Sequence, residues 1–156
     1  MRLACGAGGY GTYPKGQALA VKLRFDVSGD DFSLAGKAST ELKRTLARLG
    51  IGPAIIRKAS IAMYEGEINM VIHAGGGVIE ADIEAGGITM TLTDKGPGIP
   101  DISLAMTEGW STAPDRFREM GFGAGMGLPN AKRVSDDFHI DSGPGRGTLV
   151  RVAIIY

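Results

Sequence analysis

The chain predicts an α/β protein, a two-layer α/β sandwich with a mixed, largely antiparallel sheet. Two pairs of segments, at 78–94 and 138–156, show the two-residue hydrophobic alternation of strands, and helical patterns separate them. Strands that follow one another directly form hairpins, whereas a doubly wound parallel sheet needs a helix between consecutive strands. The length of 156 residues fits one domain, and 44% hydrophobic content is enough for a core.

The first elements are a strand and an amphipathic helix. The apolar spacing from Ala20 to Val27 predicts the strand. Asp30 or Asp31 can cap the helix that follows, because a carboxylate accepts hydrogen bonds from the free amides at a helix start. This helix ends at Gly50, and its apolar residues recur at three- and four-residue spacing: Ala35, Ala38, Leu42, Leu46 and Leu49.

A second helix and a hairpin come next. Pro53 suits the first turn of a helix that runs to about Ala74, where three consecutive glycines stop it. Alternation at 78–85 and at 88–94 predicts two strands around the turn residues Gly86-Gly87.

The last third of the chain alternates loops with short elements. A short helix is expected at 102–108, an irregular stretch at 109–123, and a helix at 128–135 that tolerates Pro129 in its first turn. Two strands, at 138–142 and 148–156, close the domain and are joined by the sequence GPGRG.

Composition and charge exclude several classes of function. Lys plus Arg and Asp plus Glu both number 17, which argues against a nucleic-acid binder or a polybasic membrane anchor. One cysteine and two histidines exclude an internal disulfide and a Cys/His metal site. No apolar run reaches the ~18–20 residues of a membrane span, so a cytoplasmic protein is expected. Residues 1–20, rich in glycine, are expected to be a flexible or loosely docked arm on a domain at 21–156.

A polar stripe interrupts the apolar second helix. Glu65, Asn69 and His73 are four residues apart and therefore share one helix face. A solvated face would explain them. Alternatively they line a site and need partners there, because an unpaired buried polar group costs about 1–3 kcal/mol.

Two strands end with a polar residue in a core-facing position. Asp94 has the same parity as Ile88, Met90 and Leu92, so its carboxylate could accept a hydrogen bond from a ligand amino group. Alternatively, Asp94 begins the turn before Gly96. Thr148 likewise begins a core-facing row.

A glycine-rich segment, GFGAGMGLPN, leads directly into a predicted helix. Its glycines allow a ligand to approach the backbone closely, and the amides at the helix start favour phosphate. It is neither a P-loop, which ends in Gly-Lys-Ser/Thr, nor a Rossmann fingerprint, which follows a first strand.

In this order the segments resemble the GHKL ATPase superfamily, which includes gyrase, histidine kinases, mismatch-repair ATPases and the large heat-shock chaperone. The match covers about residues 25–156 and implies a Bergerat-type fold. The N box corresponds to EGEINMVIH, the first glycine box to DKGPGIPD, and the second to GFGAGMGLPN followed by GRGT. The Asn-x-x-x-His ending of the N box and the stretch AKRVSDDFHIDSGPGRGT are most similar to anti-sigma-factor-type serine/threonine kinases, including stress-signalling switch kinases.

The resemblance implies a set of roles in binding Mg-ATP. Glu65 would be the general base and Asn69 the ligand of Mg²⁺. Asp94 would bind the adenine amino group, supported through water by Thr148. The loop of the first glycine box would let the adenine ring approach the backbone, through Gly96, Gly98 and Ile99. The second would hold the phosphates, through Gly123, Gly125, Met126, Gly127 and Leu128.

The segment 109–122 would be the ATP lid. Arg116 or Arg118 in it would contact the γ-phosphate, and the sequence does not choose between them. Glu67 is assigned to packing or solvent. His73 either lies near the site or has a structural role at the helix end.

The function that the resemblance implies is a Mg-ATP-dependent serine/threonine protein kinase. Its substrate would be a small STAS-type antagonist protein in a partner-switching circuit, with a sigma factor or scaffold as a further partner and a homodimer as a possible assembly. A nucleotide-gated anti-sigma factor that sequesters a sigma factor is the main alternative, and a simple ATPase is a third.

Overall fold

The structure is a computed structural model and describes residues 20–156. The predicted arm at 1–20 therefore lies, apart from Ala20, outside the described residues. From Val21 onward the chain forms the single sheet and the helical layer expected of the predicted domain.

One five-stranded sheet forms the base of the molecule, and all four of its strand pairings are antiparallel. The sequence had allowed for a mixed sheet; no parallel pair occurs among the described strands. The strands follow the order β1-β2-β3-β5-β4, with bounds β1 Val21–Ser28, β2 Gly76–Glu84, β3 Gly87–Asp94, β5 Thr148–Ile155 and β4 Asp137–Ser142.

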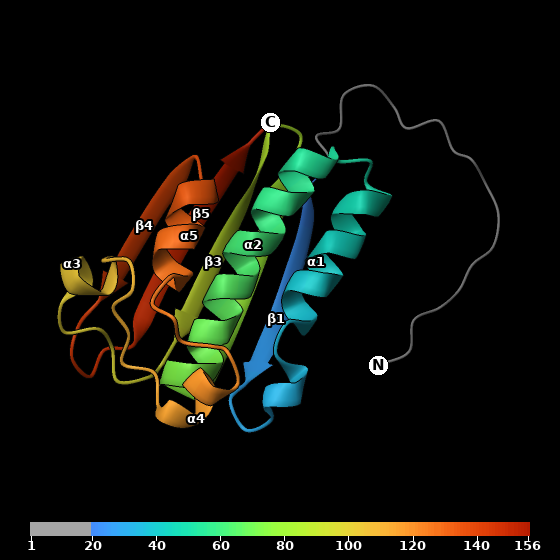
Figure 1. Cartoon of the computed structure of the whole chain (residues 1–156). Coiled ribbons are helices and arrows are strands. Elements are labelled where there is room, and N and C mark those ends of the chain that lie inside the picture. Colours follow the sequence, from blue (N-terminus) through green and yellow to red (C-terminus); the bar gives the residue numbers. More distant parts are fainter. Residues whose placement is uncertain (1–19) are drawn as a thin grey trace, which may run out of the picture.

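Three helices cover one face of this sheet, as Figure 1 shows: α1 (Lys37–Arg48), α2 (Pro53–Asn69) and α5 (Gly127–Val134). The main core lies between the two layers, where alternate strand residues meet the apolar faces of the helices. Its fully buried side chains include Leu42, Leu46, Met63, Ile79, Ile83, Ile88, Met90, Val152 and Ile154. The predicted two-layer α/β sandwich is therefore confirmed.

The first helix begins later than the sequence predicted. Asp31 does cap a helix, but this is the short 3₁₀ helix η1 (Phe32–Leu34), where its carboxylate accepts a hydrogen bond of 2.9 Å from the Ser33 amide. Gly36 then adopts φ +91°, which ends any continuous helix at this point, and α1 starts afresh at Lys37.

Helix α2 extends through a π-helical segment, η2 (Met70–Ala74), so the predicted end near Ala74 is confirmed. Gly75, at φ +70°, terminates it. Such π segments are frequent at functional sites, and this one follows directly after Asn69.

Two further boundaries differ from the prediction. The β2–β3 turn is formed by Ala85 and Gly86, because Glu84 pairs with Gly87 and Gly87 already belongs to β3. The expected helix at 102–108 is shorter, α3 (Ile102–Ala105), and the stretch expected to be irregular contains the five-residue helix α4 (Asp115–Glu119).

Candidate functional site

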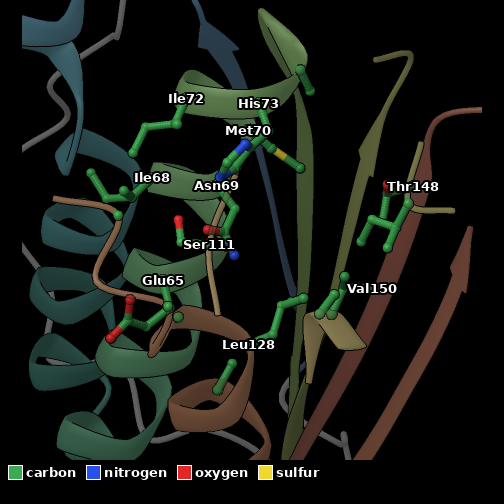
Figure 2. A pocket seen from close by; sticks show the side chains of 18 of the residues that line it. Glu65, Ile68, Asn69, Met70, Ile72, His73, Ser111, Leu128, Thr148 and Val150 are labelled. Carbon is green, nitrogen blue, oxygen red and sulfur yellow. The ribbon is translucent and has the colours of Figure 1, made fainter. Parts of the chain in front are cut away.

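A cavity of about 470 Å³ opens beside α2, under the segment that links α3 to α5. This volume lies in the range of small-molecule sites, and most of the lining is apolar. Figure 2 labels Glu65, Asn69 and His73 on the helical side of the cavity and Thr148 and Val150 on the sheet. The predicted site residues that line the cavity are Glu65, Asn69, Asp94, Gly98, Ile99, Gly123, Gly125, Met126, Gly127, Leu128 and Thr148.

Glu65 and Asn69 converge on the first residue of α5, Gly127. A Cβ atom placed on Gly127 would lie 3.2 Å from both terminal atoms of the Asn69 amide and 3.4 Å from Oε2 of Glu65. The other carboxylate oxygen, Oε1, accepts a hydrogen bond of 2.9 Å from Nδ2 of Asn130 on α5. A carboxylate, an amide oxygen and a glycine-lined helix start thus meet at one point.

Asp94 lies at the end of β3, opposite Thr148 in the register of β5. Its Oδ1 atom accepts hydrogen bonds from the amides of Gly96 (2.9 Å) and Thr148 (3.1 Å). Asp94 therefore begins the turn, as one interpretation held, and lines the cavity as well. Among the described residues no group donates to Oδ2, which leaves that oxygen for a ligand. The cavity that Asp94 borders is also lined by apolar side chains, among them Met70, Leu92 and Val150.

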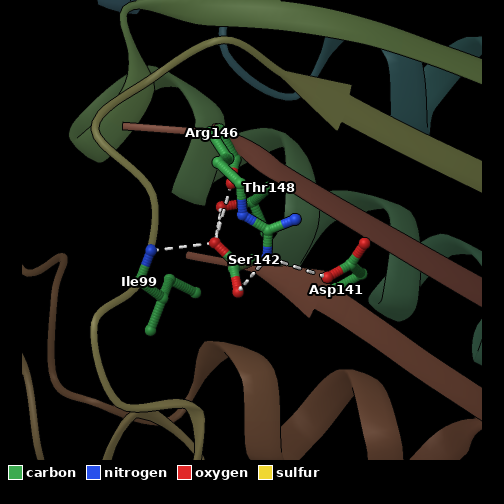
Figure 3. Close-up of polar contacts among 6 residues, drawn as sticks. Ile99, Asp141, Ser142, Arg146 and Thr148 are labelled. Carbon is green, nitrogen blue, oxygen red and sulfur yellow. Dashed lines mark hydrogen bonds and ion pairs between the residues drawn. The ribbon is translucent and has the colours of Figure 1, made fainter. Parts of the chain in front are cut away.

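A hydroxyl pair ties the two closing strands to the loop after β3, as Figure 3 shows. The Ser142 hydroxyl donates to the Gly147 carbonyl (2.8 Å) and accepts from the Ile99 amide (2.8 Å). Because its single proton is engaged, the Thr148 hydroxyl is the donor in their 2.9 Å contact. Within residues 20–156 no group donates to the Thr148 hydroxyl oxygen, so its lone pairs are left for a ligand or a water molecule.

The glycines after β3 are required by the protein's own backbone. A Cβ on Gly96 would lie 2.6 Å from the Cα and Cβ atoms of Ala74, and Gly96 does not line the cavity. Gly98, at φ +76°, would meet the Gly143 carbonyl at 1.9 Å. At both positions glycine allows two segments of the chain to pack closely against each other. Of the two residues, Gly98 also borders the cavity.

The second glycine segment folds against the root of the predicted lid. Gly123 and Gly125 have φ near +75°, and Cβ atoms on them would lie 2.3 Å from the Ala113 Cβ and 2.5 Å from the Trp110 carbonyl oxygen. The Gly125 carbonyl also accepts a hydrogen bond of 3.0 Å from the Gly109 amide. The segment that the resemblance assigns to phosphate binding is thus held by the same loop that covers the cavity.

Arg116 and Arg118 are both exposed and neither lines the cavity. The Arg116 guanidinium lies 4.7 Å from the centre of the Phe117 ring. Arg118 donates to the Ser111 carbonyl at 3.0 Å, and Ser111 does border the cavity. The structure does not bring either arginine to the groups around Glu65.

His73 lines the cavity, although the residue as a whole is exposed. Partial desolvation lowers the pKa of its imidazole, and the nearby Asp94 carboxylate opposes this by favouring the charged form. Since the ordinary value is 6.5 and the net direction is downward, the ring is predominantly neutral at pH 7.

Glu67, two residues after Glu65, belongs to the fold. It is 2% exposed, and its two oxygens accept hydrogen bonds from the amides of Ala38 (3.1 Å) and Ser39 (3.2 Å). These amides belong to the first turn of α1, whose N-cap residue Gly36 has no side chain to cap it. The carboxylate of α2 thus caps α1, and of the two assignments made from the sequence, packing is confirmed.

Two polar residues that hydrogen-bond to residues of the site were missed from the sequence, Asn130 and Ser142. Ser142 has the parity of Phe138 and Ile140 in β4 and ends a core-facing row, so the reasoning applied to Asp94 could have found it. Asn130 ends the glycine-rich segment GFGAGMGLPN, but its contact with Glu65 could not be predicted, because the two residues are 65 positions apart in the chain.

Within residues 20–156 no helix is long and apolar enough to cross a membrane. The same residues contain no group of three or more His, Cys, Asp or Glu side chains that could hold a metal ion.

Comparison with known proteins assigns the chain to a family. Residues 56–155 match the model described as histidine kinase-, DNA gyrase B- and HSP90-like ATPase. The serine/threonine-protein kinase RsbT of Bacillus subtilis is 35% identical over 119 residues, 73% of this chain and 84% of that protein. The anti-sigma F factor of Thermoanaerobacter sp. is 35% identical over 109 residues, 65% and 73% of the two chains.

A solved structure shares the fold. The crystal structure of the RsbU and RsbW domains of a Mycobacterium tuberculosis protein superposes with a TM-score of 0.57 at 18% identity. The match covers 85% of this chain but 32% of that longer one. Because the family model spans well over half of the chain, the predicted superfamily is confirmed: this protein belongs to the histidine kinase-, DNA gyrase B- and HSP90-like ATPases, an ATP-binding family.

Proposed function

We propose that the protein is a Mg-ATP-dependent serine/threonine protein kinase of the anti-sigma-factor type, which phosphorylates a STAS-type antagonist protein. The observation that supports this most directly is the convergence of Glu65 and Asn69 on Gly127 at one end of the cavity, with Asp94 lining the same cavity. Recognition of the adenine base needs only the Asp94 region. A free carboxylate oxygen beside the start of α5 adds what phosphoryl transfer requires.

The residues around the cavity fit ATP. Oδ2 of Asp94, to which no group of the described residues donates, can accept a hydrogen bond from the adenine amino group in this largely apolar cavity. Gly123, Gly125 and Gly127 bring the backbone close to the cavity at the start of α5, where no side chain of the described residues caps the helix. The free amides of such a helix start bind phosphate oxygens.

The residues also fit Mg²⁺ in the way that nucleotide enzymes hold it. Mg²⁺ prefers oxygen ligands and is usually bound by one or two protein groups together with substrate phosphates and water. The Asn69 amide, adjacent to Gly127, can supply one such oxygen. When bound, Mg²⁺ would neutralise charge on the phosphates, which favours phosphoryl transfer.

Glu65 would serve as the general base. One of its oxygens is engaged by Asn130, and the other lies beside Gly127, where a γ-phosphate held by α5 would be found. From this position Glu65 can accept the proton of a seryl or threonyl hydroxyl as the hydroxyl attacks the γ-phosphorus, the bond from that phosphorus to the bridging β–γ oxygen breaks, and ADP leaves. Its negative charge also disfavours an anionic side chain at the acceptor position.

Two named relatives support the kinase and the type of circuit. One is a serine/threonine-protein kinase and another an anti-sigma F factor. We infer from these names that the partners are an antagonist protein and a sigma factor. The second name also favours the alternative, in which nucleotide sets the conformation of a sigma-binding protein and Glu65 is dispensable.

Phosphoryl transfer to STAS-domain proteins of the source organism tests the proposal. Purified protein is incubated with γ-labelled Mg-ATP and each STAS protein, and labelled serine or threonine is identified by mass spectrometry. We expect Glu65→Ala to lower the transfer rate by about 10²–10⁴-fold, the usual contribution of a general base. The control is Glu84→Ala, an exposed carboxylate at the far end of β2, which should transfer phosphate like wild type.

The outcomes separate the candidates. Loss of the label in Glu65→Ala, with labelling unchanged in Glu84→Ala, supports the kinase. Equal transfer by Glu65→Ala and wild type would remove the base assignment. A sigma factor bound by both proteins in the presence of ATP, with no labelled acceptor, would favour sequestration. Steady phosphate release without any protein acceptor would indicate a simple ATPase.

A further inference from the structure

Helix α5 carries a polar chain that leads from Glu65 to the root of the lid. Nδ2 of Asn130 donates to Oε1 of Glu65 at 2.9 Å. The Arg133 guanidinium, one turn later, donates to Oδ1 of Asn130 at 3.1 Å and also pairs with the Glu108 carboxylate. Glu108 immediately precedes Gly109, the first residue of the predicted lid.

The chemistry of the neighbours fixes how the Asn130 amide points. An arginine can only donate hydrogen bonds, and an ionised glutamate can only accept them. The amide between them must therefore turn its oxygen to Arg133 and its NH₂ group to Glu65. With the amide reversed, oxygen would face carboxylate and NH₂ would face guanidinium, and both contacts would be lost.

Asn130 itself is outside the cavity: its neighbours Pro129 and Ala131 line the cavity, and Asn130 does not. It holds one oxygen of Glu65 and leaves the other, Oε2, beside Gly127. A base held in this way keeps one rotamer and one free oxygen toward the incoming hydroxyl, and such orientation of a catalytic group accelerates a reaction.

We propose that Asn130 is a positioning residue for Glu65 and that Arg133 sets the direction of its amide. This inference rests on the proposed function, because it presumes that Glu65 acts as the base. Asn130 would act on the rate of the chemical step and leave nucleotide affinity unchanged.

The first test separates kcat from KM in Asn130→Ala. We expect kcat to fall about 10–100-fold, the effect of losing one hydrogen bond to a charged group, while KM for ATP stays within about twofold. Arg133→Ala should lower kcat less, because the amide remains but is free to turn. Lys132→Ala, an exposed neighbour on the same helix, is the matched control and should behave as wild type.

The double variant Glu65→Ala/Asn130→Ala distinguishes positioning from a general loss of structure. If Asn130 acts through Glu65, the double variant should equal Glu65→Ala alone. A further fall in rate in the double variant, or a Tm loss that accounts for the effect of Asn130→Ala, would overturn the inference.

The outcomes are distinguishable from failure of the proposed function. If Glu65→Ala retains wild-type transfer, the base assignment fails and the inference with it. If Glu65→Ala is inactive while Asn130→Ala is normal, only the inference fails.

A readout without turnover is the side-chain amide signal of Asn130 in ¹⁵N-labelled protein, assigned by its absence in Asn130→Ala. We expect this signal to move in Glu65→Gln and to stay in place in Glu84→Gln. A signal indifferent to Glu65→Gln would overturn the contact itself.

Discussion

Glu65 and Glu67 illustrate how two like residues on one helix divide between chemistry and folding. They differ by two positions, so they project from different sides of α2. Glu65 faces α5 and the cavity, whereas Glu67 is buried against the start of α1. Substitution of Glu67 should therefore lower the stability of the fold, whereas substitution of Glu65 should lower the rate of phosphoryl transfer.

Glu67→Ala is expected to destabilise the fold by about 2–4 kcal/mol, because it leaves two buried amides of α1 without an acceptor. Urea denaturation monitored by circular dichroism measures this change. Glu65→Ala is the matched comparison: it should change the free energy of unfolding by less than about 1 kcal/mol and lower the transfer rate by about 10²–10⁴-fold. Equal stability of the two variants would contradict the capping role.

Asp94 combines both functions in one side chain, and the substitution Asp94→Asn separates them. The variant keeps Oδ1, which accepts from Gly96 and Thr148, but replaces the free Oδ2 with a donating NH₂ group. We expect the Kd for ATP to rise about 10–100-fold, since a charge-assisted hydrogen bond is lost and two donors oppose each other.

Isothermal titration calorimetry with wild type, Asp94→Asn and the exposed control Asp26→Asn measures the effect. Unchanged affinity in Asp94→Asn, with the control normal, would mean that the adenine lies elsewhere.

At the scale of elements, the lid is held by an aromatic cluster outside the main core. The ring of Phe32 in η1 lies 5.4 Å from that of Phe117 in α4 and 4.8 Å from that of Phe122. Ile68 of α2 and Ile72 of η2 belong to the same cluster. The connection between β1 and α1 thus packs on the lid. The sequence predicted only an irregular lid at 109–122, whereas apolar residues within this segment pack it against the helix that carries Ile68.

Phe32→Ala should loosen the lid and leave the rest of the fold unchanged. Each aromatic pair contributes about 0.5–1.5 kcal/mol beyond its buried area, and two pairs are lost. Hydrogen exchange followed by mass spectrometry should show faster exchange at 111–122 and unchanged exchange in α1. Leu34→Ala, on the same short helix but outside the cluster, is the control. Equally faster hydrogen exchange at 111–122 in both variants would contradict the role of Phe32 in holding the lid.

At the scale of the whole molecule, the strand order assembles the site. The closing hairpin inserts β5 between β3 and β4, so the last strand pairs with β3. This pairing places Thr148 opposite Asp94 although 54 residues separate them. Helix α2 crosses to the same end and brings Glu65 and Asn69 to α5. Elements from four parts of the chain therefore line one cavity.

Local patterns in the sequence determined the elements and the candidate residues. Alternation with period two predicted the five strands and the inward direction of Asp94 and Thr148, because strand side chains alternate between faces regardless of the partner strand. Spacing by four likewise predicted that Glu65 and Asn69 share a face. The family followed from motifs that are each contiguous in the chain.

Contacts between distant segments were decided only by the tertiary structure. The capping of α1 by Glu67, the hydrogen bond from Asn130 to Glu65 and the packing of Phe32 on the lid all join residues whose interaction no local period encodes. Gly96 and Gly98 follow the same rule, since the backbones that exclude a Cβ there come from Ala74 and Gly143. The direction of a side chain is a property of the local backbone, whereas the residue that it contacts depends on how the sheet and the helices pack together.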